Sequence, residues 1–350
     1  MSNPLSNFDR RRAATVKAVV LRERGGPEIL RVEAWPEPVA GPGEAIVALR
    51  AAALNHRDVW IRRGTLSAGA APIVPGSDGA GNVVAVGAGV DPSWNGAAVV
   101  INPSLDWGAD PRVQGPHWRI LGLPDDGTYA ELVKVPAANL HPKPEALTFE
   151  QAAAIPLAGL TAYRALVSRA RLRPDDVVLV TGIGGGVALF ALAIARRVGA
   201  PVFVTSGSDD KIARARALGA SGGVSYRVPD WPRQLTDMTD GKGPSVVIDG
   251  TGGESLAKAI EIVRPGGRVV NYGGTGGPIA PLSPRSIFWK QIDVMGSTMG
   301  TSAEFGAMLR LYDEGALRPV VDSVLPLEEA AAAHARMERG DQFGKIILRI

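Results

Sequence analysis

Residues 177–193 read V-V-L-V-T-G-I-G-G-G-V-A-L-F-A-L-A, and this stretch decides the fold. An apolar run typical of a buried strand leads into a glycine-rich turn and then into a run with the composition of a helix. Glycines in such a turn let the backbone approach a pyrophosphate, whose charge the positive end of the helix stabilises. The stretch therefore predicts a dinucleotide-binding turn, with a purely structural turn as the alternative. The turn contains Gly182, Gly184, Gly185 and Gly186, and its helix is expected from Val187.

The same order of strand, turn and amphipathic helix recurs downstream of this stretch. Such a rhythm is typical of a parallel sheet with crossover helices. We therefore predict an α/β fold with a doubly wound parallel sheet. Its expected strands lie at residues 177–181, 202–205, 245–249, 268–272 and 292–296, and its expected helices at 187–198, 209–218 and 254–262.

Upstream, short alternating runs separated by Gly, Pro, Asp and Asn predict an irregular β-rich domain. The change of pattern falls near residues 141–150, where a proline-rich stretch precedes an alanine-rich helical pattern. After Leu317 a strand, a helix and a last strand are expected to return to the β-rich domain. We expect a flexible tail at residues 1–14, a β-rich domain at 15–145 and 316–350, and a nucleotide-binding domain at 146–315.

The composition of the 350-residue chain, 45% hydrophobic and 21% charged, provides enough apolar material for two domains. The longest strongly apolar run, residues 187–195, is far shorter than the roughly 20 residues of a membrane-spanning helix. The lack of cysteine excludes disulfides, a cysteine nucleophile and thiolate zinc sites. The net charge of +3 resides in residues 1–17, so the remaining chain is neutral. We expect a cytoplasmic protein that binds neither nucleic acid nor membrane.

The turn after the second expected strand reads T-S-G-S-D-D-K at residues 205–211. NAD-binding folds usually carry a carboxylate about 20 residues beyond the glycines, where it binds the ribose hydroxyls. Here Ser206 lies in that turn, Asp209 and Asp210 come slightly later, and Lys211 adds a positive charge. A hydroxyl and a lysine suit a 2′-phosphate, so NADP(H) is the expected cofactor. In the alternative interpretation the aspartates cap the helix and Lys211 is solvated, and both can hold at once.

Several longer motifs are spread over nearly the whole chain. They read A-L-N-H-R-D-V-W-I-R-R-G at residues 53–64, P-G-S-D-G-A-G-N-V-V-A-V-G at 75–87, D-G-T-Y-A-E-L-V-K-V-P at 126–136, P-L-A-G-L-T-A-Y-R-A-L at 156–166 and F-G-K-I-I-L at 343–348. Together with the glycine turn, they resemble the medium-chain dehydrogenase/reductase superfamily, in particular its zinc-independent quinone oxidoreductase-like branch. The resemblance implies a GroES-like catalytic domain, a Rossmann domain, a cleft between them, and a homodimer or tetramer.

The zinc enzymes of this superfamily bind a catalytic metal through two cysteines and a histidine. The corresponding positions here hold Asn55, Ser77 and Leu157, so no metal is expected. Without a metal Lewis acid, simple alcohol oxidation loses several kcal/mol of transition-state stabilisation, whereas a conjugated acceptor delocalises the incoming charge. We therefore expect NADPH-dependent reduction of a quinone or an α,β-unsaturated carbonyl. The alternatives are an NADP(H)-dependent alcohol or aldehyde dehydrogenase, and an NADPH-binding sensor or moonlighting RNA-binding protein with little turnover.

The resemblance also implies roles for single residues. Asn55, His56 and Thr161 are the expected catalytic residues, although the tyrosine that many relatives carry as a proton donor is Leu66 here. Lys345 is expected to add charge near the phosphates or to be an exposed lysine at the end of a strand. The expected cofactor-binding residues are Thr161, Gly182, Gly184, Gly185, Gly186, Val187, Ser206, Lys211, Tyr226, Gly274, Thr275, Ser297 and Lys345.

Two further sets of side chains are assigned a role from the sequence, one in structure and one in the substrate pocket. Arg57 and Asp58, which are adjacent in the chain, are expected to pair with each other in a structural role. Trp60, Trp107 and Trp118 are candidates for the wall of an apolar substrate pocket, although packing is the commoner role of tryptophan.

Overall fold

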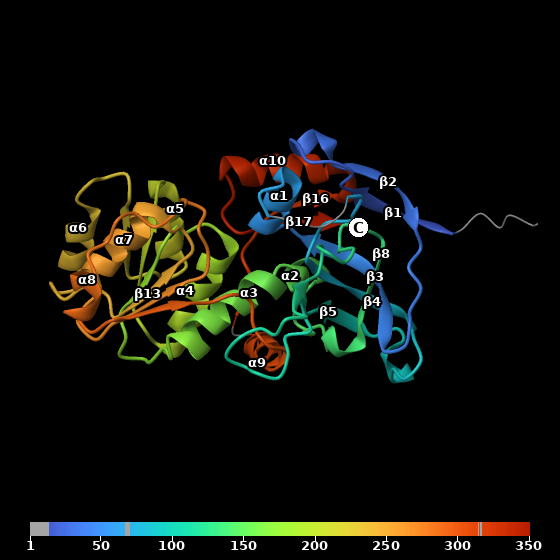
Figure 1. Ribbon diagram of the computed structural model, residues 1–350, viewed down its shortest axis with the longest axis horizontal. Coiled ribbons are helices and arrows are strands. Elements are labelled where there is room, and N and C mark those ends of the chain that lie inside the picture. Colours follow the sequence, from blue (N-terminus) through green and yellow to red (C-terminus); the bar gives the residue numbers. More distant parts are fainter. Residues whose placement is uncertain (1–13, 67–70, 314, 316) are drawn as a thin grey trace, which may run out of the picture.

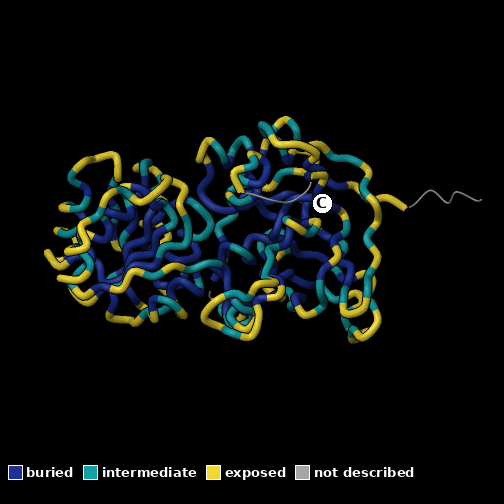
Figure 2. Tube along the Cα trace, viewed as in Figure 1, coloured by how far each residue is buried: buried dark blue, intermediate teal, exposed yellow. Residues whose placement is uncertain are grey.

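The computed structural model describes residues 14–66, 71–313, 315 and 317–350, and it has two halves that lie side by side (Figure 1). One half is β-rich and the other holds a parallel sheet covered by helices. Buried residues fill the centre of each half and the junction between them (Figure 2). Except for Ala14, the tail expected at residues 1–14 lies outside the described residues.

The parallel sheet has six strands in the order β12-β11-β10-β13-β14-β15, which confirms the prediction of a doubly wound sheet. Along β10, Val178 and Val180 belong to the hydrophobic core that includes α4, whereas Leu179 belongs to the core under α6 and α7. Both faces of the strand are therefore buried, which explains its continuous apolar sequence. The strands are β10 (Val178–Val180), β11 (Val202–Ser206), β12 (Gly222–Ser225), β13 (Val246–Asp249), β14 (Arg268–Asn271) and β15 (Asp293–Gly296).

The helices of this half include the one expected after the glycine turn. They are α4 (Gly186–Val198), α5 (Asp209–Ala217), α6 (Trp231–Met238), α7 (Gly253–Ile262), α8 (Arg285–Phe288) and α9 (Ser302–Asp313). The segment between the two halves forms α2 (Phe149–Ala153), α3 (Pro156–Tyr163) and a π-helical turn at Arg164–Arg169. α3 packs against both α4 and α9, so the connecting segment belongs to the same core as the parallel sheet.

The β-rich half is built on a seven-stranded sheet in the order β16-β17-β3-β4-β5-β9, with β8 paired to β3. The C-terminal strand β17 lies between β16 and β3, so the chain returns to this half at its end. The strands are β1 (Thr15–Val20), β2 (Arg31–Pro36), β3 (Glu44–Ala53), β4 (Asp78–Val86), β5 (Ala98–Ile101), β6 (Ser104–Leu105), β7 (Arg119–Ile120), β8 (Leu132–Pro136), β9 (Leu140–Pro142), β16 (Val321–Pro326) and β17 (Lys345–Arg349), and the helices are α1 (His56–Arg63) and α10 (Ala330–Arg339).

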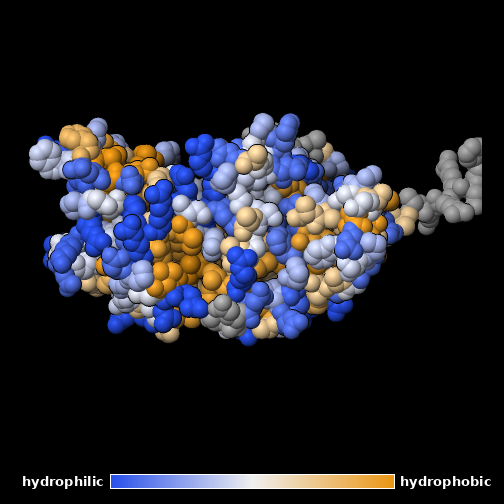
Figure 3. All heavy atoms as spheres, turned by 90° about the horizontal axis from the view of Figure 1, so that it is seen from below, coloured by the Kyte–Doolittle hydropathy of each residue, from blue (hydrophilic) through white to orange (hydrophobic). Residues whose placement is uncertain are grey.

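Within the described residues, four α-helices have no counterpart in the sequence-based prediction, namely α1, α6, α8 and α9. α1 begins directly after β3 and carries charged residues on much of its surface, so it lacks a long apolar stripe. Asp58 stabilises its start, since its carboxylate accepts a hydrogen bond from the backbone N–H of Asn55 at 2.8 Å. None of the helices in the described part of the chain has the length and apolar character needed to cross a bilayer. Seen from below, hydrophobic side chains gather on the half that holds the parallel sheet (Figure 3).

Candidate functional site

A cavity of about 730 Å³ lies between the two halves, at the carboxyl ends of β10, β11, β13 and β14. This is where the strand order reverses on either side of β10, and ligands of doubly wound sheets bind at such a switch point. The cavity wall contains most of the residues expected from the sequence: Asn55, His56, Thr161, Gly182, Gly185, Gly186, Val187, Ser206, Lys211, Tyr226, Thr275 and Lys345. Gly184, Gly274 and Ser297 are not part of the wall, although Gly273 and Thr298 beside two of them are.

The glycine turn has two positions that require glycine for its backbone conformation. Gly182 and Gly184 have φ angles of 65° and 122°, a region that side-chain-bearing residues rarely adopt. Gly185 caps the start of α4, and a Cβ atom there would meet nothing within 4 Å. At Gly186 a Cβ would lie 2.8 Å from Cδ of Lys345. The turn therefore combines an open cradle at Gly185 with a tightly packed helix start at Gly186, and this geometry fits a bound pyrophosphate.

Three polar side chains on the cavity wall lie near the end of β11: Ser206, Lys211 and Tyr226. The Nζ of Lys211 donates to the carbonyl oxygen of Gly340 at 2.6 Å. This contact ties the cation to the C-terminal segment, so Lys211 is not simply solvated. Ser208 is the N-cap of α5, and its hydroxyl accepts from the N–H of Lys211. The expectation that Asp209 and Asp210 cap the helix is therefore wrong, and they occupy its first turn instead.

A buried polar cluster borders the cavity beside Gly186, where Lys345 of β17 reaches β4 and the start of α1. The Nζ of Lys345 donates to three acceptors: the carbonyl oxygen of Leu54 at 2.7 Å, Oδ1 of Asn55 at 2.7 Å and Oδ2 of Asp78 at 2.9 Å. Nδ2 of Asn55 donates to the same carboxylate at 2.9 Å, and the backbone N–H of Leu157 donates to Oδ1 of Asp78 at 2.8 Å.

This geometry decides against one of the two expectations for Lys345, the exposed lysine. The side chain is 3% exposed, so it is not a solvated lysine at the end of a strand. Its three ammonium protons are used by Leu54, Asn55 and Asp78, and its methylene chain lies against Gly186 of the glycine turn. The expectation that it adds charge near the phosphates stays a prediction.

The other residues of α1 that face the cavity have separate partners. His56 keeps its ring open to the cavity, and its pKa is lowered by desolvation and by the positive charges of Lys345 and Lys211. Arg57 does not pair with Asp58 as expected; it donates to Oγ of Ser77 at 2.7 Å and to a backbone carbonyl oxygen. The carboxylate of Asp58 instead accepts from the backbone of Asn55 and from a buried tyrosine hydroxyl.

Two family models match the chain: an alcohol dehydrogenase GroES-like domain over residues 41–145 and a zinc-binding dehydrogenase domain over residues 186–314. The chain is 35% identical to a zinc-type alcohol dehydrogenase-like protein, YogA, of Leptosphaeria maculans, over 92% of this chain and 94% of that protein. This similarity covers both halves. The chain belongs to the medium-chain dehydrogenase/reductase superfamily.

The chain is also similar to a quinone oxidoreductase and to two solved structures of the medium-chain dehydrogenase/reductase superfamily, and it belongs to the quinone oxidoreductase-like branch. Human quinone oxidoreductase is 30% identical over 95% of this chain and 97% of its own length. A solved NAD-dependent alcohol dehydrogenase is 45% identical with a TM-score of 0.91, covering 95% of this chain and 99% of that one. A 2-octenoyl-CoA carboxylase reductase, CinF, solved with NADP and 2-octenoyl-CoA, is 28% identical with a TM-score of 0.88, covering 96% and 87%.

The residues at the superfamily's zinc-ligand positions do not fit a zinc ion. Zinc binds lone-pair donors such as thiolate, imidazole and carboxylate, whereas Leu157 has no donor atom in its side chain. The amide oxygen of Asn55 already accepts from the ammonium of Lys345 at 2.7 Å. Ser77 donates to the carbonyl oxygen of Leu121 at 2.7 Å. Within the described residues, no group of three His, Asp or Glu side chains is placed to hold a metal ion.

Thr161 and the three tryptophans were also expected near the active site. Thr161 is buried on α3, and its hydroxyl donates to the carbonyl oxygen of Leu157 at 2.8 Å. Trp60 and Trp118 line the cavity as expected, but Trp107 does not; it packs against Trp118 and under the guanidinium of Arg164.

The sequence-based expectations missed two residues of the site. Asp78 is the acidic residue of the G-S-D motif at residues 76–78, a motif that was considered only for its serine. Tyr272 lines the cavity at the end of β14, where burial and the charge of Asp249 raise its pKa.

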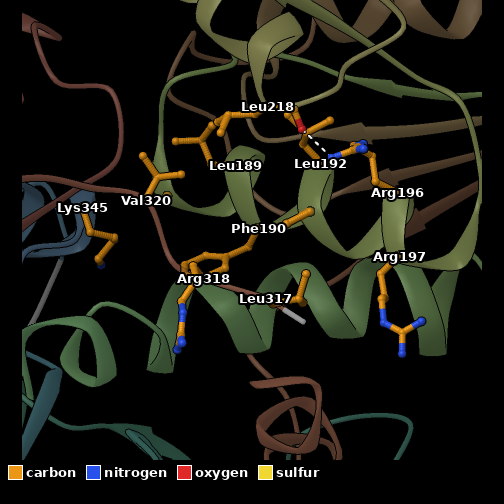
Figure 4. Close-up of a pocket in the computed structure, with 12 residues that line it drawn as sticks. Leu189, Phe190, Leu192, Arg196, Arg197, Leu218, Leu317, Arg318, Val320 and Lys345 are labelled. Carbon is orange, nitrogen blue, oxygen red and sulfur yellow. Dashed lines mark hydrogen bonds between the residues drawn. The ribbon is translucent and has the colours of Figure 1, made fainter. Parts of the chain in front are cut away.

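A second hollow of about 320 Å³ lies on the other side of α4, and Figure 4 shows its wall. Leu189 and Phe190 form much of its surface, and Arg196 turns to the carbonyl oxygen of Leu218 at 2.7 Å. Only Gly186 and Lys345 line both hollows. The larger cavity unites the glycine turn with the polar cluster, so it is the candidate active site.

Proposed function

We propose that this protein is an NADPH-dependent oxidoreductase that reduces a quinone or an α,β-unsaturated carbonyl without a catalytic zinc ion. The observation that carries the proposal is a single cavity whose wall includes the glycine turn and, beside it, Asn55 and Lys345, whose side chains bind Asp78. The nicotinamide, when bound, supplies a hydride. The chain itself supplies apolar side chains on the cavity wall, such as Trp60, Trp118 and Ile120, beside the polar groups described above, which suits an acceptor that spreads the incoming charge over a conjugated system.

The proposed preference for NADPH rests on the end of β11. Ser206, Lys211 and Tyr226 offer two hydroxyls and an ammonium where NAD-specific folds carry a carboxylate. The CinF structure contains NADP, whereas the 45% identical alcohol dehydrogenase is described as NAD-dependent. Because these two relatives point to different cofactors, the proposed preference relies on the side chains near the end of β11 and not on overall sequence identity.

An alcohol or aldehyde dehydrogenase is the second candidate. The names of two relatives favour it, because both the fungal protein and the 45% identical structure are described as alcohol dehydrogenases or similar to them. The side chains at positions 55, 77 and 157 argue against the zinc-dependent form of that reaction.

The test compares oxidation of NADPH and NADH by metal-stripped protein, with and without added zinc. The acceptors are 1,4-naphthoquinone, 2-cyclohexenone and an aldehyde. We expect NADPH-dependent, zinc-indifferent reduction of the two conjugated acceptors, and we expect Ser206→Asp to shift the preference toward NADH by about tenfold or more. Zinc-dependent aldehyde reduction would favour the second candidate. Tight NADPH binding without turnover would instead favour a sensor or moonlighting RNA-binding protein.

A further inference from the structure

We propose that Asn55 is a catalytic residue that donates one amide N–H to the acceptor oxygen that gains negative charge, and that Lys345 and Asp78 are positioning residues that orient this amide. The inference rests on the proposed function, and it identifies the group that takes over charge stabilisation in a site without fitting zinc ligands. The inference implies conjugated carbonyl acceptors whose oxygen can reach the amide of Asn55 at the start of α1.

The two ends of the Asn55 amide are held by opposite charges. Oδ1 accepts from the ammonium of Lys345 at 2.7 Å, and Nδ2 donates to the carboxylate of Asp78 at 2.9 Å. Rotating the amide by 180° would place its NH2 group against the ammonium and its oxygen against the carboxylate, so both contacts would become repulsive. The geometry therefore selects one amide orientation.

This orientation leaves one donor for a ligand. Nδ2 carries two protons, and within the described residues only one of them has a protein acceptor, Oδ2 of Asp78. Asn55 lines the cavity and is 7% exposed, so a ligand that fills the cavity would leave the remaining donor in a surrounding with little water. A hydrogen bond to a developing oxyanion is stronger in such a surrounding than in water.

Lys345 also strengthens this donor. An ammonium bonded to the amide oxygen withdraws electron density from the amide group, which makes its N–H a better donor. The ammonium is held in place because its two other protons bind Leu54 and Asp78, and because its methylene chain packs across Gly186. Asp78 compensates the buried positive charge, so the cluster as a whole is neutral.

The chemical step is balanced without any further reactant. The acceptor carbon gains a hydride, the displaced π-electron pair moves onto the conjugated oxygen, and the N–H of Asn55 stabilises that oxygen. A proton from solvent then completes the reduced product, so one NADPH and one proton are consumed for each acceptor molecule reduced.

The first test uses Asn55→Leu and Asn55→Asp with saturating NADPH and 2-cyclohexenone. Loss of one oxyanion donor is expected to lower kcat about 100- to 1,000-fold, while the dissociation constant of NADPH stays within about threefold. For Asn55→Asp we expect kcat to rise again as the pH falls, because the introduced carboxyl regains a donor when it is protonated. Besides the introduced carboxyl, the titratable groups that face this position are Lys345, Asp78, His56 and Asp58.

A second measurement does not depend on turnover. In the complex with NADP⁺, 4-nitrophenol serves as an analogue of the charged oxygen, and its absorbance reports whether it is bound as phenol or phenolate. We expect the wild-type protein to lower the apparent pKa of the bound nitrophenol relative to water, and we expect Asn55→Leu to abolish most of that shift.

The positioning role is tested with Asp78→Asn and with the double variant Lys345→Met/Asp78→Leu, which leaves no lone buried charge. We expect a loss of kcat with a smaller change in KM, and a weaker preference for bound phenolate. The matched control is Arg268→Met/Asp176→Leu, which removes a largely buried ion pair outside the cavity. That control is expected to retain wild-type kcat and phenolate preference even where its stability falls.

The two proposals fail in different ways. If wild-type protein oxidises neither NADPH nor NADH with any acceptor, the proposed function fails. If the wild type turns over but both Asn55 variants keep kcat within threefold and bind phenolate as the wild type does, the inference about Asn55 is overturned and the function stands. If Asn55 variants lose activity but the double variant does not, the positioning role of Lys345 and Asp78 is overturned.

Discussion

His334 of α10 is a fully buried imidazole whose Nδ1 accepts a hydrogen bond from Nε of Arg62 at 3.4 Å. Its ring meets Tyr129 edge-on at a centroid distance of 6.0 Å. Burial, together with the positive charge of Arg62, lowers the pKa of His334 to about 3. The folded protein thus binds this proton more weakly than the unfolded chain, in which the histidine pKa is about 6.5.

A pH-dependent stability follows from this difference. The contribution of His334 is fully present above about pH 6.5 and is lost as the pH falls toward 3, because protonation then favours the unfolded chain. At about 1.4 kcal/mol for each pKa unit, we expect His334 to account for about 2 kcal/mol of the stability lost between pH 7 and pH 5. Urea unfolding of His334→Gln should show a correspondingly flatter profile. His117→Gln, at an exposed histidine, is the control, and an unchanged slope in His334→Gln would contradict the prediction.

The start of α4 provides a matched pair of adjacent glycines, one open and one packed. A Cβ at Gly185 meets nothing within 4 Å, whereas a Cβ at Gly186 would lie 2.8 Å from Cδ of Lys345 and 3.1 Å from Cβ of Ala158. Lys345 cannot easily move aside, since its Nζ is held by three hydrogen bonds. The space beside Gly185 is therefore open to a ligand, whereas the space beside Gly186 is filled by Lys345 and Ala158.

We expect Gly185→Ala to leave the free energy of unfolding within about 1 kcal/mol of wild type but to weaken NADPH binding at least tenfold. Gly186→Ala is expected to destabilise the protein by about 1–3 kcal/mol through overpacking. Urea unfolding and fluorescence titration with NADPH measure the two effects. Equal NADPH affinity in Gly185→Ala and wild type would show that the cradle at this turn does not hold the cofactor.

The parallel sheet ends at β15, an edge strand whose backbone is unpaired on one side within the described structure. Val294 on this strand is 44% exposed, and Phe288 and Trp289 beside it are 63% and 67% exposed. An exposed edge strand flanked by apolar side chains favours pairing with another strand. We propose that a second copy of the chain covers this edge, in line with the homodimer or tetramer expected from the family resemblance.

Light scattering coupled to size-exclusion chromatography tests this assembly. The wild type is expected to have at least twice the mass of one chain, and Trp289→Glu combined with Val294→Glu is expected to shift it toward the monomer. Val39→Glu, at an exposed apolar residue on the other half, is the control and should keep the wild-type mass. A monomeric wild type would refute the prediction.

Much of the architecture was accessible from local patterns. The alternation of Val178, Leu179 and Val180 between two cores produces the continuous apolar run from which the central strand was predicted. The helix α1 was not predicted, because its eight residues mix charged and apolar side chains and show no long apolar period. Its start depends on the Asp58 carboxylate, whose hydrogen bonds to Asn55 and Tyr129 join segments 71 residues apart in the chain.

The sequence alone determined the doubly wound sheet and the glycine turn, because both follow from residue types at short spacing. The replacement of the zinc ligands was also visible in the sequence, but only through the family resemblance that identifies those positions. The partners of Lys345 were decided by tertiary structure. Its closest charged partner, Asp78, lies 267 residues away in the chain, and the contact exists because β17 is inserted beside β3. A lysine side chain is long and flexible, so its sequence position does not indicate which acceptors it reaches. The acceptors of Lys345 follow from its burial, because an ammonium removed from water requires an acceptor for each of its protons.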